Sequence, residues 1–155
     1  MIKRIDKKKL AVITLSIIVV MQFFTIDKTQ ADTDPTKDFI AMTQPDEHVI
    51  TMLKTACYNC HSNETTYPWY ANIAPVSWWI KSHEEEAKEH LNFSVWGDYS
   101  LKQQDHKLEE LYEEVEEGEM PLPSYTWVHA DARLTGEQKE QLITWVKNLR
   151  VKINE

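Results

Sequence analysis

Both cysteines of the chain lie three positions apart, and a histidine follows the second one directly. Residues 56–62 read A-C-Y-N-C-H-S, which makes the group Cys57, Cys60 and His61. Such a pair is used by a redox-active dithiol, by half of a zinc site, or by the covalent attachment of a c-type haem. A plain disulfide between the two cysteines is a fourth possibility if the chain is exported. The remaining residues of the chain distinguish among these chemistries.

The zinc and dithiol alternatives each explain only part of the group. A structural zinc site needs four ligands, and His61 is poorly spaced to join both cysteines on one tetrahedral metal. The missing ligands would have to come from the other histidines, at positions 48, 83, 90, 106 and 129. A reactive dithiol favours the N-terminus of a helix, where the dipole lowers the thiol pKa. Here the pair follows a predicted helix, and the strand–helix alternation of a thioredoxin context is missing.

Haem attachment uses every residue of the group. Cys57 and Cys60 would each form a thioether with a haem vinyl group, and His61 would reach the iron as the proximal axial ligand. The sequence therefore favours one covalently attached haem c.

The remaining pattern predicts an all-α domain that positions this group. Apolar residues at helical spacing predict a first helix from Asp46 to Cys57, and further helices at about 76–92 and 101–117. Gly118 is placed to end the third of these. Thr135 and Gln138 form a capping-box pattern at the start of a last amphipathic helix. The intervening stretches 58–75, 93–100 and 118–134 contain aromatic residues, glycine or proline and are predicted to be loops.

The order of these elements resembles the class I cytochromes c, in which the first and last helices cross beside the haem. L-T-G-E-Q-K-E-Q-L-I-T-W-V (134–146) is similar to the last helix of that family. The longer pattern C-Y-N-C-H-S-N-E-T-T-Y-P-W-Y-A-N-I-A-P-V-S-W-W-I, with G-E-M-P-L (118–122), resembles the bacterial haem-binding domain family. That family consists of small exported cytochrome c-like modules. The resemblance covers roughly residues 40–150, and this chain adds a helical stretch at about 76–117 to the minimal class I pattern.

The resemblance implies further site residues. Met120 corresponds to the methionine before a proline that supplies the sixth iron ligand in such cytochromes, with His83, His90, His106 and His129 as competitors. Pro75 follows His61 by 14 positions, and a proline carbonyl at a similar distance accepts the proximal histidine Nδ1–H in class I cytochromes. Tyr70 and Trp78 are candidate residues of the haem pocket. Aromatic residues in a helical domain are more often simply core.

The N-terminus predicts export. Five basic residues precede an uncharged run at 10–26, which is short for a membrane span and long for a signal-peptide core. We expect residues 1–26 to act as a signal-anchor or a cleaved signal peptide, 27–45 as a linker, and 46–155 as the haem-binding domain. The domain would then lie on the periplasmic side of the inner membrane, or be soluble after cleavage at Ala31. The basic end is predicted to remain cytoplasmic.

The charge limits the class of partner. From Asp27 onward the chain has 12 basic and 24 acidic residues, so we expect no binding to nucleic acid. Three functions remain. The first is a monohaem electron carrier with a redox partner protein. The second is a haem-based sensor or ligand-binding module with a displaceable sixth ligand. The third is an enzyme such as a peroxidase or a thiol oxidoreductase. The sequence offers no distal acid–base group with the charged partner that peroxide chemistry needs, although His129 near Met120 leaves a peroxidase open.

Overall fold

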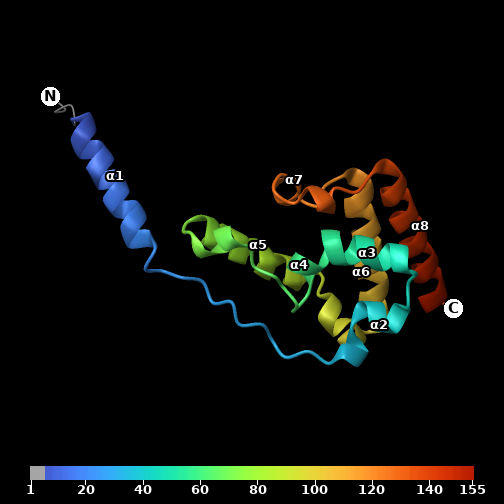
Figure 1. The fold of residues 1–155 in the computed structure, drawn as a ribbon. Helices are drawn as coiled ribbons and strands as arrows, with labels where there is room; N and C mark the ends of the chain where they lie inside the picture. The colour runs from blue at the N-terminus through green and yellow to red at the C-terminus, as the bar shows by residue number, and fades with distance from the viewer. Residues whose placement is uncertain (1–5) are drawn as a thin grey trace. The chain divides into compact units, whose positions relative to one another are not determined.

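The computed structural model describes residues 6–155, and every regular element in that range is a helix (Figure 1). The prediction of an all-α chain is therefore confirmed for the described residues. Lys3 and Arg4, two of the five N-terminal basic residues, lie outside them. The α-helices are α1 (Lys7–Met21), α2 (Phe39–Thr43), α3 (Glu47–Ala56), α4 (Tyr58–His61), α5 (Val76–His90), α6 (Leu101–Glu117), α7 (Pro123–Thr126) and α8 (Gly136–Ile153). The 3₁₀ turns are η1 (Pro35–Lys37), η2 (Trp69–Asn72), η3 (Phe93–Asp98) and η4 (Ala130–Ala132).

These elements form two units. The smaller one contains the chain up to Thr29 together with Tyr67–His83, and so holds α1, η2 and the first half of α5. The larger one contains Gln30–Thr66 and Glu84–Glu155, which includes the cysteine group and the last helix.

The helix ends of the larger unit follow local capping rules. The Asp46 carboxylate accepts the backbone N–H of Val49 at 2.9 Å and starts α3. Thr135 and Gln138 form the predicted capping box of α8. Gly118 ends α6 with φ of +84°, a left-handed conformation that glycine adopts without a steric cost. The predicted bounds of α6 are confirmed.

The core of the larger unit is aromatic and aliphatic, and its most deeply buried side chains come from several helices. They are Phe39, Leu53, Phe93, Leu108, Leu142 and Val146. The long helices α6 and α8 pack side by side across this core (Figure 1). Arg150 on α8 reinforces the pair, since its guanidinium donates to Asp105 at 2.6 and 3.2 Å and to Glu109 at 2.8 Å on α6. These two ion pairs connect the last helix, α8, to α6.

The prediction of a linker over residues 27–45 is wrong for its second half. Phe39 on α2 has no exposed surface, and its ring lies 5.0 Å from that of Phe93 and 4.7 Å from that of Trp96. The Asp38 carboxylate caps α2 by accepting the N–H of Ile40. The folded domain therefore begins before Asp46, because one aromatic side chain within a polar stretch is recruited into the core.

The helix α1 is 15 residues long and begins with three lysines, followed by uncharged, mostly apolar residues. Within residues 6–155, the structure contains no helix with both the length and the apolar character that crossing a bilayer requires.

We predict that Phe39→Ala will lower the free energy of unfolding of the larger unit by about 3–5 kcal/mol, because it leaves a cavity among buried rings. Urea unfolding followed by circular dichroism measures this loss. Leu101→Ala is the matched control, since Leu101 is mostly exposed at the start of α6 and should cost less than about 0.5 kcal/mol. Equal, small effects of both substitutions would show that residues 30–45 are a tether after all.

Candidate functional site

The cysteine group lies on a single helical turn that directly follows α3. Cys57 ends α3 and precedes α4, with a backbone conformation (φ −123°, ψ −46°) that interrupts the helix. The Cys57 carbonyl accepts the N–H groups of Cys60 at 3.1 Å and of His61 at 3.0 Å. Ser62 stabilises the turn, because its hydroxyl donates to the Tyr58 carbonyl at 2.7 Å. Cys57, Cys60 and His61 are thus fixed relative to one another by backbone hydrogen bonds.

Both thiols are half-buried and not joined in a disulfide. Burial raises the pKa of Cys57 to about 12. The pKa of Cys60 is also raised, chiefly by burial and further by the negative charge of Glu84. A reactive dithiol needs the opposite shift, because the thiolate is the nucleophile. The environment of the pair therefore argues against the redox-dithiol alternative.

The imidazole of His61 is held by a backbone carbonyl. Its Nδ1 lies 3.0 Å from the carbonyl oxygen of Leu91, the residue that follows α5. Burial lowers the pKa of His61, and the carbonyls of Leu91 and Ala87 oppose this effect only in part. A neutral ring with Nδ1–H bound to Leu91 presents the lone pair of Nε2, which is the form that binds a metal. The predicted acceptor was the carbonyl of Pro75, and the structure gives this role to Leu91 instead.

The segment that carries Leu91 is attached to the cysteine turn by a buried polar network. Asn92 donates from its side-chain amide to that of Asn63 at 2.9 Å, and the backbone N–H of Asn63 donates to the Ser94 hydroxyl at 3.0 Å. The rings of Tyr58 and Phe93 stack at 4.9 Å, and the Tyr58 hydroxyl donates to Asp38 at 3.0 Å. These contacts are not visible in the sequence, since the hydrogen-bonded partners are 20, 29 and 31 positions apart and no local spacing connects them.

Met120 lies on the turn that follows α6. Its backbone N–H donates to the Glu114 carbonyl at 3.0 Å, a bond that Gly118 permits by turning the chain back. Its side chain is half-buried and packs against the same hydrophobic core as Cys57. The chain after Met120 also meets the cysteine turn, because Asn59 donates to the Tyr125 hydroxyl at 2.8 Å.

His129, the other candidate ligand in this segment, stacks on Tyr125 at 4.2 Å. The structure thus brings the segment of Met120 and His129 to the cysteine turn. Tyr70, Pro75 and Trp78 belong to the smaller unit. Their assignment to a haem pocket stays a prediction.

The comparison with protein-family models decides the family. The model of the haem-binding domain family matches residues 16–148, which is most of the chain. The chain belongs to the haem-binding domain family. Searches of curated proteins and of solved structures found no match.

The donor set of this haem-binding domain fits a haem. Two thiols without a disulfide and an imidazole with a directed Nε2 are the groups that a C-x-x-C-H site uses. Within residues 6–155, no cluster of three or more His, Cys, Asp or Glu side chains is arranged to hold a bare metal ion.

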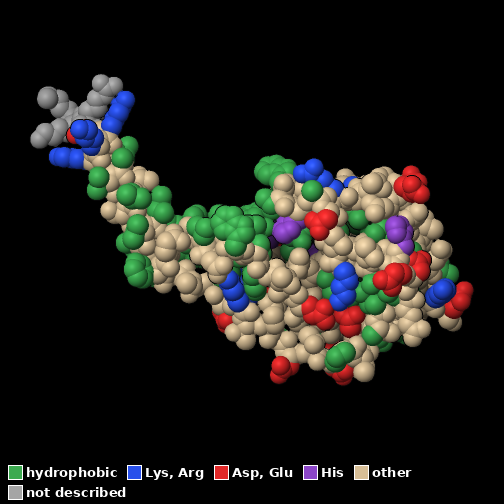
Figure 2. Space-filling model, in the orientation of Figure 1, with side chains coloured by type: hydrophobic (Ala, Val, Ile, Leu, Met, Phe, Trp, Pro, Cys, Tyr) green, Lys and Arg blue, Asp and Glu red, His purple; other side chains and the backbone are tan. Residues whose placement is uncertain are grey.

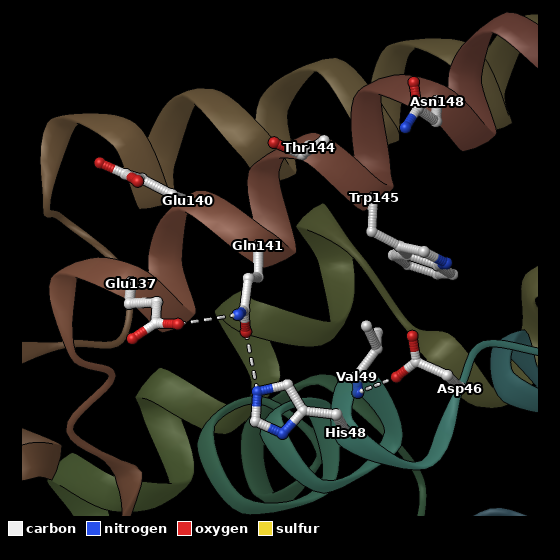
Figure 3. Close-up of a pocket in the computed structure, with 9 residues that line it drawn as sticks. All are labelled: Asp46, His48, Val49, Glu137, Glu140, Gln141, Thr144, Trp145 and Asn148. Atoms are coloured by element: carbon white, nitrogen blue, oxygen red, sulfur yellow. Dashed lines mark hydrogen bonds between the residues drawn. The ribbon is translucent and has the colours of Figure 1, made fainter.

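A separate groove of about 550 Å³ lies between α3 and α8 of the haem-binding domain (Figure 3). His48 contacts the Gln141 side chain at 2.8 Å, and Gln141 donates in turn to Glu137 at 3.4 Å. Trp145 lies at its inner side, where its ring contacts that of Phe39. The groove shares none of the residues of the cysteine group.

We predict that the folded apoprotein will react slowly with iodoacetamide at neutral pH, at a rate roughly a hundredfold below that of the unfolded chain or slower. The raised thiol pKa values leave little thiolate until the pH rises well above the ordinary cysteine range. Alkylation followed by mass spectrometry measures the rates, with circular dichroism as the control for folding. Equally fast alkylation of a chain that retains its native helix content would contradict the burial of the pair and reopen the dithiol alternative.

Proposed function

We propose that the chain is a monohaem c-type cytochrome that carries electrons and is not an enzyme. The observation that carries this proposal is the turn Cys57–His61, which combines two half-buried thiols that form no disulfide with an imidazole held through Nδ1 by the Leu91 carbonyl. Membership of the haem-binding domain family supports a haem as the group that this turn takes.

Each residue of the turn has a distinct task in this proposal. Cys57 and Cys60 would hold the haem through two thioethers, and His61 would bind the iron through Nε2. When bound, the haem supplies a reversible one-electron change at its iron. The Leu91 carbonyl keeps the imidazole in one tautomer and one orientation and increases its basicity, which favours the oxidised state.

Met120 is the proposed sixth ligand, and its setting favours a carrier over a sensor. Its backbone is tied to Glu114 and its side chain packs on the core, so it is poorly placed to leave. A carrier benefits from ligands that stay in both redox states, because little then reorganises during electron transfer. The second candidate function, a sensor or ligand-binding module, would need a displaceable ligand. The observation that favours this second candidate is a competing ligand in the same segment, since His129 stacks on Tyr125 in the chain that follows Met120.

We further propose that the domain acts outside the cytoplasm, at the periplasmic face of the inner membrane or in soluble form after signal cleavage. The basic residues before an uncharged run support export. The acidic excess of the body favours a redox partner protein with a basic face.

Covalent attachment is the first test. After denaturation and acid-acetone extraction, haem should remain with the wild-type chain. In the double variant Cys57→Ser/Cys60→Ser the haem should be extracted fully, because no thioether can form. Each single variant should retain one thioether and hold its haem in part. Complete extraction of haem from the wild type would contradict a c-type site, while leaving a non-covalent haem protein possible.

Replacement of the sixth ligand is the second test. Met120→Ala should abolish the sulfur-to-iron charge-transfer absorption and lower the reduction potential, because a thioether stabilises reduced iron. Carbon monoxide binding to the reduced protein should rise from negligible to nearly stoichiometric. His129→Ala is the matched control and should leave all three readouts unchanged.

Two outcomes would overturn the role of Met120. Ready binding of carbon monoxide by the wild type would favour the sensor. If the effects follow His129→Ala instead of Met120→Ala, the histidine is the sixth ligand.

The location is tested by fractionation and N-terminal sequencing of the exported protein. We expect the chain in the inner-membrane fraction with its domain accessible from the periplasm. A wholly soluble protein that begins at Asp32 would establish the signal-peptide alternative, and a cytoplasmic protein would exclude export.

A further inference from the structure

The smaller unit exposes a cluster of large apolar side chains that no part of the proposed electron-transfer function uses. Trp69 is 75% exposed and Trp79 is 47% exposed, with Ile73 and Val76 exposed between them in the sequence. At the C-terminal end of α1, Phe23 and Phe24 are also exposed. Figure 2 shows hydrophobic side chains along α1 and gathered around its end. Exposing several large apolar side chains to water in one region is energetically unfavourable, so such a patch indicates a contact surface.

Hydrogen bonds join the end of α1 to the aromatic stretch. The Gln22 side chain accepts the backbone N–H of Ala74 and donates to the Ala74 carbonyl, both at 3.1 Å. The indole N–H of Trp78 donates to the Phe24 carbonyl at 2.7 Å, and Lys28 donates to the Asn72 side chain at 2.6 Å. Residues about 50 positions apart in the sequence therefore build one surface within the smaller unit.

The chemistry along this surface changes from one end to the other. Lys7, Lys8 and Lys9 begin α1, whose later residues 17–20 are apolar and exposed on all sides of the helix. The exposed indoles of Trp69 and Trp79 lie in the aromatic stretch, residues 69–79, which is hydrogen-bonded to the chain at the C-terminal end of α1. Cations attract anionic headgroups, apolar helix surface favours hydrocarbon, and indoles accumulate at the boundary between hydrocarbon and water.

We propose that this surface, formed by α1 and residues 69–79, docks on an anionic lipid bilayer with Trp69 and Trp79 at headgroup level. The proposal adds the aromatic stretch to the membrane contact expected of the N-terminal run alone, and it holds whether or not the larger unit carries electrons. A lipid surface fits better than a protein partner, because the lysines suit anionic headgroups, the apolar part of α1 suits the outer hydrocarbon, and the two indoles suit the boundary between them.

The test is co-flotation of the full-length holoprotein with vesicles of phosphatidylcholine and phosphatidylglycerol. The wild type should float with the vesicles. Trp69→Ser/Trp79→Ser should reduce the partition constant roughly tenfold, a loss of about 1.4 kcal/mol of binding free energy. The conservative variant Trp69→Phe/Trp79→Phe should retain most of the binding. Trp127→Ser is the matched control, since Trp127 is 77% exposed but belongs to the larger unit, and it should bind like the wild type.

Several results would overturn the proposal. Equal flotation of the wild type and the double serine variant would assign binding to α1 alone. Equal losses in the double variant and in Trp127→Ser would show a nonspecific effect of exposed indoles. Undiminished binding to vesicles without phosphatidylglycerol would remove the role of the lysines. If the wild type does not float but forms a dimer that the double variant lacks, the surface is occupied by a second copy.

Discussion

The bond between His61 Nδ1 and the Leu91 carbonyl is the constraint on which the candidate site depends. It connects the cysteine turn to the end of α5, 30 positions later, and it fixes both the tautomer and the orientation of the imidazole. The polar network of Asn63, Asn92 and Ser94 and the stacked rings of Tyr58 and Phe93 serve the same connection. Without these contacts, no residue adjacent to His61 in the sequence would determine which ring nitrogen is free to bind a metal.

The proposed attachment of a haem to this turn needs donor groups that are directed before the haem arrives. The thiols are half-buried, and burial raises the pKa of both, which favours the protonated form. The group that holds His61 Nδ1 is the backbone carbonyl of Leu91, which side-chain substitution cannot remove. Tuning of the proposed iron ligand by this route therefore depends on the geometry at the end of α5 and not on the identity of residue 91.

Local features of the fold could be predicted from the sequence, and long-range features could not. The capping residues Asp46 and Thr135 and the αL glycine at position 118 satisfy backbone groups within a few residues, so their patterns are visible in the sequence. The burial of Phe39 depends on rings more than 50 positions later, which explains why its stretch was predicted to be a linker. The Leu91 acceptor was missed for the same reason. The resemblance to class I cytochromes suggested Pro75, whereas the structure places the carbonyl of Leu91, the residue after α5, at the His61 Nδ1.

The most direct test of this account is nuclear magnetic resonance of the reduced haem protein with ¹⁵N-labelled histidine and ¹³C-labelled leucine. We expect the His61 Nδ1–H to exchange slowly with solvent and to show a coupling across the hydrogen bond to the Leu91 carbonyl carbon. We also expect Nε2 to carry no proton, because it binds iron. A rapidly exchanging Nδ1–H without this coupling, or a protonated Nε2, would contradict this account.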